Sequence, residues 1–63
     1  MKKGQKLTVL NLNQVAIAAS EAVHETVHNK IPEAIRQAIF AQEELKAAIG
    51  YLKALEKSQT EGG

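Results

Sequence analysis

The segment that follows Pro32 is apolar on two sides of one helix, and this feature limits what the chain can fold into. Apolar residues recur at helical spacing along a first stripe, interrupted only by Gln42: Ile31, Ile35, Ala38, Leu45, Ile49 and Leu52. Phe40, Ala47 and Tyr51 fall on a second side, nearly opposite the first. A helix that is apolar on two sides needs cover on both, and one hairpin supplies only one of them. The pattern therefore predicts a homodimer or a larger homo-oligomer.

A second helical pattern precedes the proline. Its stripe consists of small and medium apolar residues: Leu12, Ala16, Ala19, Val23 and Val27. We expect a helix over about residues 13–28. Pro32 suits the first turn of a helix and disfavours helical geometry at Ile31, so the chain is expected to turn at residues 28–31. The second helix then runs to about residue 57, and the fold class is a mainly α helical hairpin.

The size of the chain limits its core and its chemistry. It has 63 residues, no Cys and only two aromatic residues, so neither a disulfide nor a large apolar core supports the fold. We expect one domain over residues 7–57, a basic mobile arm over 1–6 and a disordered tail over 58–63. A self-contained enzyme is excluded on size, and no cofactor is expected.

The charge and hydropathy of the chain bear on its surroundings. Eight basic and seven acidic residues give a net charge of +1. This balance is typical neither of a nucleic-acid-binding protein with a strong positive field nor of an acidic disordered tail. The longest apolar run, residues 15–19, is far too short to span a membrane. We expect a cytoplasmic protein with no membrane partner.

Residues 6–12 contain β-forming residues in rough alternation. This pattern predicts a short N-terminal strand, which would have to pair with the strand of a partner because a lone strand is unstable. The alternative is an extended lead-in whose Leu and Val side chains cover the helices.

The string from His24 to His28 matches the H-E-x-x-H pattern. On a helix the two His residues lie one turn apart and could both bind zinc, with Glu21 as a third ligand. The string resembles the zinc metallopeptidase signature, but only over these five residues. The alternative is that both imidazoles make ordinary hydrogen bonds or interface contacts, and a pair of His residues could make such an interface sensitive to pH.

The start of the second helix carries a further motif. Glu33, Ile35, Arg36, Ala38 and Ile39 follow a Glu-x-Ile-Arg-x-Ala-Ile pattern, and with the expected strand they give residues 6–40 a resemblance to the ribbon-helix-helix DNA-binding repressors. That family forms obligate dimers, in which one strand from each chain builds a two-stranded ribbon that enters the major groove of DNA.

The resemblance implies a set of DNA contacts. Lys6 and Thr8, or Asn11, would face the bases, and Lys2 and Lys3 would contact phosphates. The turn and the ribbon depart from the family: His28-Asn29-Lys30-Ile31 lacks the usual Gly and Ser, and apolar residues occupy both faces of the ribbon.

Arg36, Phe40 and Tyr51 form a candidate face for a partner or ligand, since aromatic residues are preferred binding anchors. The alternatives are that the aromatic residues pack inside the oligomer and that Arg36 is a solvated charge beside Glu33 or Gln37. Two functions remain open: a ribbon-helix-helix-like regulator that binds DNA, and a helical inhibitor, adaptor or ligand-sequestering oligomer that binds a protein or a small ligand.

Overall fold

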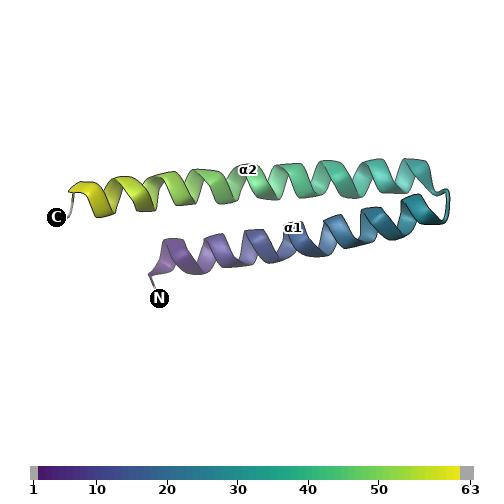
Figure 1. Ribbon diagram of the computed structural model, residues 1–63. Helices are drawn as coiled ribbons and strands as arrows, with labels where there is room; N and C mark the ends of the chain where they lie inside the picture. The colour runs from purple at the N-terminus through teal and green to yellow at the C-terminus, as the bar shows by residue number, and fades with distance from the viewer. Residues whose placement is uncertain (1, 62–63) are drawn as a thin grey trace.

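The chain folds as two antiparallel helices joined by a short turn, in a computed structural model that describes residues 2–61 (Figure 1). Helix α1 spans Lys3–Val27 and helix α2 spans Ile31–Glu61. The hairpin is elongated, measuring 51 × 17 × 12 Å between Cα atoms. The predicted mainly α helical hairpin is confirmed. Neither helix is apolar over enough of its described length to cross a membrane.

The turn lies where Pro32 places it. His28 ends α1, and Asn29 adopts a left-handed conformation with φ of 60°. The Asn29 amide donates to the Thr26 carbonyl at 3.0 Å, and the Lys30 amide donates to the Glu25 carbonyl at 2.7 Å. These bonds form a Schellman-type end, in which Asn replaces the usual Gly because its side chain tolerates this conformation. The chain therefore reverses within three residues, and the two helices run side by side.

Residues 6–12 are helical, so both expectations for this segment, the strand and the extended lead-in, are corrected. No strand is present in residues 2–61. A strand here would leave its backbone groups without partners inside the chain, whereas a helix satisfies them locally. The helical conformation also turns Thr8 and Asn11 toward α2, where both are at least half-buried.

The helices reach into both segments that were expected to be irregular. Helix α1 begins at Lys3, inside the predicted arm, and α2 ends at Glu61, inside the predicted tail. The remaining parts of those two expectations, residue 1 and residues 62–63, lie outside the described residues.

The helices meet along a seam of mostly small or polar side chains. Successive seam residues are three or four positions apart, the spacing of an antiparallel coiled coil. Gly4, Thr8, Asn11, Val15, Ala18, Ala22 and Glu25 form the α1 side, and Ala34, Gln37, Ala41, Glu44, Ala48, Tyr51 and Leu55 form the α2 side. Thr8, Ala18, Ala34 and Ala48 are the buried residues of the described chain, and none of them is large. The seam thus allows close helix packing but buries little apolar surface.

Candidate functional site: an apolar face and a mixed face

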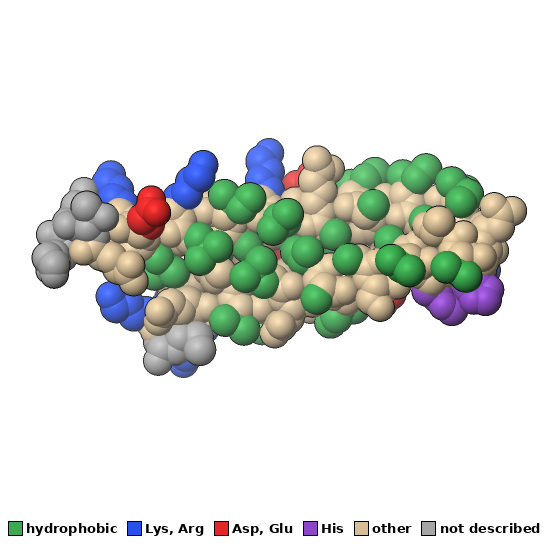
Figure 2. Space-filling view, in the orientation of Figure 1, with side chains coloured by type: hydrophobic (Ala, Val, Ile, Leu, Met, Phe, Trp, Pro, Cys, Tyr) green, Lys and Arg blue, Asp and Glu red, His purple; other side chains and the backbone are tan. Residues whose placement is uncertain are grey.

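The larger apolar side chains gather on one side of the hairpin. In each helix, the residue after a seam residue is rotated by about 100° from it, and in antiparallel helices that rotation leads to the same side of the pair. We call this side the apolar face; it consists of Val9, Leu12, Ala16, Ala19 and Val23 from α1 and of Ile31, Ile35, Ala38, Leu45, Ile49 and Leu52 from α2. Hydrophobic side chains from both helices run along the hairpin in Figure 2. The two stripes recognised in the sequence thus lie next to each other rather than facing each other.

The apolar face is open to solvent along its whole length. Val23 is 64% exposed, Ile35 53% and Leu52 46%. Gln42 is the only polar residue within the α2 part of this face, and no charged residue lies within either part. An uncharged, continuous apolar surface of this length is typical of a protein interface.

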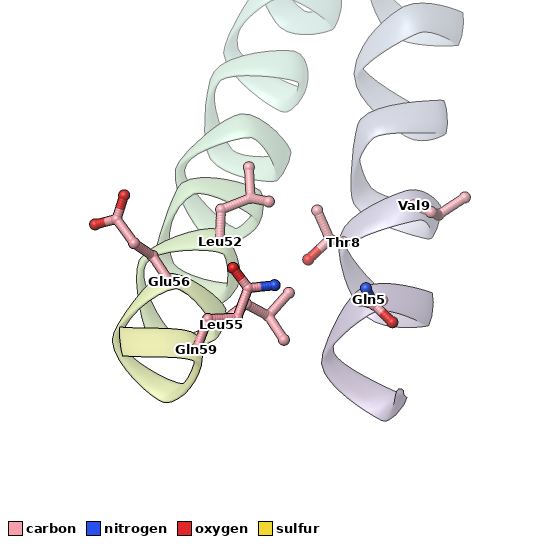
Figure 3. Close-up of a pocket in the computed structure, with 7 residues that line it drawn as sticks. All are labelled: Gln5, Thr8, Val9, Leu52, Leu55, Glu56 and Gln59. Atoms are coloured by element: carbon pink, nitrogen blue, oxygen red, sulfur yellow. The ribbon is translucent and has the colours of Figure 1, made fainter. Parts of the chain in front are cut away.

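A pocket of about 550 Å³ opens on this face at the end of the hairpin that holds the termini (Figure 3). The side chains that line it are Gln5, Thr8 and Val9 from α1 and Leu52, Leu55, Glu56 and Gln59 from α2. The Thr8 and Leu55 side chains point into the gap between the helices. Leu55 reaches Gly4, where an added Cβ would lie 3.3 Å from Leu55 Cδ2. The pocket is therefore a widening of the seam that continues into the apolar face.

The opposite side of the hairpin, which we call the mixed face, combines apolar and charged residues. It consists of the residues that precede the seam positions, among them Leu10 and Ile17 from α1 and Phe40, Ala47 and Gly50 from α2. Three acidic residues, Glu21, Glu33 and Glu43, and three basic residues, Lys3, Arg36 and Lys57, accompany them. The charges on this side therefore balance.

The predicted partner residues lie on or beside the mixed face. Phe40 is 45% exposed, and Tyr51, although it occupies a seam position, is 37% exposed. The Arg36 guanidinium lies 3.3 Å from a carboxylate oxygen of Glu33, one turn earlier, and both side chains are largely exposed. Such an ion pair contributes little to stability, so Arg36 remains able to contact a partner.

The structure separates the five residues assigned to DNA contacts. Lys2, Lys3 and Lys6 are exposed around the start of α1. Thr8 is buried, and its hydroxyl donates to the Gly4 carbonyl at 2.7 Å. The Asn11 amide donates across the seam to a carboxylate oxygen of Glu44. Asn11 therefore joins the two helices, Thr8 is buried in the seam between them, and neither side chain faces outward.

The H-E-x-x-H string lies at the end of α1 beside the turn. The ring centroids of His24 and His28 are 4.4 Å apart, with the planes tilted by 49°. Within the described residues, no three His, Cys, Asp or Glu side chains are grouped closely enough to hold a metal ion. Glu21 therefore does not complete a three-ligand site with the two imidazoles.

Sequence reasoning missed the Asn11–Glu44 hydrogen bond and the pocket at the open end. The signal that could have shown both is the second, small-residue heptad pattern, which runs one position before the apolar stripe in each helix. Comparison with protein-family models, with curated proteins and with solved structures gives no match.

Proposed function

We propose that this chain is a non-catalytic helical protein that self-associates through its apolar face and acts by binding a partner protein through its mixed face. The observation that carries the proposal is that every large apolar side chain of the apolar face is at least 39% exposed in the single hairpin. A hairpin that buries three alanines and one threonine lacks the apolar burial that holds a domain of this size together. A second copy supplies the missing burial.

The dimensions of the hairpin fit this role. The broad side measures 51 × 17 Å between Cα atoms. The area of this rectangle is similar to the surface of roughly 800 Å² that each partner buries in a standard protein interface. Two hairpins stacked on their apolar faces form a four-helix bundle, in which the apolar residues of all four helices meet in one core.

The mixed face supports the choice of a protein as partner. Phe40 and Tyr51 are suitable anchors, and the equal numbers of acidic and basic residues suit a protein surface of mixed charge. A DNA-binding surface needs an excess of positive charge to neutralise phosphates. The ribbon-helix-helix mode also needs a ribbon from residues 6–12, which are helical here. The adaptor or inhibitor function is therefore favoured over the DNA-binding regulator.

Two matched isoleucines test the assembly. Ile49 lies on the apolar face, whereas Ile39 lies on the outer side of α2; they are 44% and 53% exposed. Ile49→Lys is expected to break the oligomer into chains that lose helicity, because it places a charge in the core of the bundle. Ile39→Lys is expected to leave the assembly intact. Light scattering after size exclusion gives the mass, and equal masses for both variants and the unaltered protein would contradict the proposal.

A further inference from the structure

The apolar face is nearly symmetric about its own centre. Along α2, three apolar residues precede Gln42 and three follow it, at separations from Gln42 that agree to within one residue: Ile31, Ile35 and Ala38, then Leu45, Ile49 and Leu52. Along α1, the face is centred on Ala16, with Leu12 and Ala19 on either side and Val9 and Val23 beyond them. Reversal about the centre therefore brings apolar positions onto apolar positions, with Leu12 corresponding to Ala19 and Ala38 to Leu45.

The two centres lie at the same level of the hairpin. Asn11 bonds to Glu44, and Gly4 lies against Leu55. A residue of α1 and the residue of α2 beside it therefore have numbers that add to between 55 and 59. Ala16 is therefore level with residues 39–43, a range that includes Gln42. One two-fold axis can pass through both centres at once.

The two ends of the apolar face carry different features. The open end carries the pocket, with Val9 and Leu52 among its lining residues. The turn end carries Val23 and Ile31, which are 64% and 45% exposed. Reversal about the centre brings Val23 opposite Val9 and Ile31 opposite Leu52, so that exposed side chains at one end meet the pocket at the other.

We propose that two copies pack apolar face to apolar face about a two-fold axis that crosses the helices at right angles, at the level of Ala16 and Gln42. This inference rests on the proposed self-association. Each helix then packs antiparallel against its own counterpart. The Gln42 side chain meets Gln42 of the second copy, and the two amides donate to and accept from each other across the axis.

Gln42 decides between this arrangement and the other two-fold stacking. An axis parallel to the helices would place α1 of one copy on α2 of the other, with Gln42 against the alanine region around Ala16. The amide would then be buried without a partner, which is costly. It would also stack the pocket of one copy on the pocket of the other. A single polar residue in an apolar seam commonly fixes orientation in this way.

Single-cysteine cross-linking tests the orientation in the full chain, which has no Cys of its own. Oxidised Gln42→Cys is expected to form a covalent dimer by itself. An equimolar mixture of Val9→Cys and Val23→Cys chains, which keep Gln42, is expected to give the mixed dimer, whereas neither forms a dimer alone. The disulfide requires Cβ atoms about 3.5–4.5 Å apart, so it reports direct opposition.

The competing stacking has its own signature. In that stacking Val9 of one copy lies opposite Ile49 of the other, because the two residues are at the same level of the hairpin. Cross-linking of Val9→Cys chains with Ile49→Cys chains, in place of Val9→Cys with Val23→Cys, would overturn the inference and leave self-association intact. A single-chain mass by light scattering before oxidation would instead overturn the proposed function. Gln42→Leu is then added to each cysteine variant. Because the orienting amide is lost, the two mixed cross-links are expected to form in comparable yield. An unchanged preference for the Val9–Val23 link would contradict the role of Gln42.

Discussion

At the scale of the residue, Gly50 is the clearest departure from good helix formation. It lies in the middle of α2 on the mixed face, and an added Cβ would meet no atom within 4 Å. We predict that Gly50→Ala stabilises the protein by about 0.5–1 kcal/mol, because glycine carries the larger entropy cost in a helix. Denaturant unfolding followed by circular dichroism measures the change.

Gly4 provides the contrasting case. Its Cβ would lie 3.3 Å from Leu55 Cδ2, so Leu55 must shift if Gly4 is replaced by Ala. We expect Gly4→Ala to gain less stability than Gly50→Ala. An equal or larger gain at Gly4 would show that the end of the seam is looser than this contact indicates. The open space around Gly50 excludes close helix packing within the hairpin as the reason for this glycine.

Asn11 is a second residue whose role depends on the fold. It joins the helices by donating to Glu44 within the half-buried part of the seam. We predict that Asn11→Ala destabilises the protein by about 1–3 kcal/mol, the cost of losing a hydrogen bond to a carboxylate and leaving that group without its donor. Asn13→Ala, at an exposed position on the outer side of α1, is the control and is expected to cost much less in the same unfolding experiment.

At the scale of the element, the alanine seam determines how closely the helices pack. Ala48 is fully buried in it, whereas the neighbouring Ala47 is exposed on the mixed face. We predict that Ala48→Leu destabilises the hairpin by about 1–3 kcal/mol through overpacking, while Ala47→Leu changes the free energy of unfolding little. Similar effects from both substitutions would mean that the helices are not in close contact at this level.

The helices and the turn could be predicted from the sequence because their signals are local. Pro32 and the 3.6-residue periodicity locate the turn and most of both helices. The conformation of residues 6–12 could not be predicted, since the β-forming residues there favour a strand locally. The packing of Thr8 and Asn11 against α2, together with the backbone hydrogen bonds of a helix, favours the helical conformation. Tertiary contacts overrode local propensity.

The candidate site was predictable only in part, for a related reason. The apolar stripes were visible, but the largest apolar side chains are normally assigned to the core. Here Ala18, Ala34 and Ala48 occupy the seam, while Ile35 and Ile49 lie outside it. The sequence does not show which of two overlapping heptad patterns pairs within the chain. The small-residue pattern pairs within the hairpin, and the large-residue pattern remains exposed.

At the scale of the whole molecule, the proposed self-association would couple folding to assembly. The hairpin alone buries few apolar atoms, and the proposed stacking of two apolar faces would bury the large side chains of all four helices. We therefore predict that the midpoint of thermal unfolding rises with protein concentration, as it does when folded chains are stabilised by association. Circular dichroism melts over a hundredfold range of concentration measure this dependence.

The most direct test of self-association is sedimentation equilibrium of the unaltered chain at micromolar concentration. We expect a mass of two chains that is retained while the protein is helical, with dissociation and loss of helicity occurring together on dilution. A stable, fully helical species with the mass of one chain would contradict it.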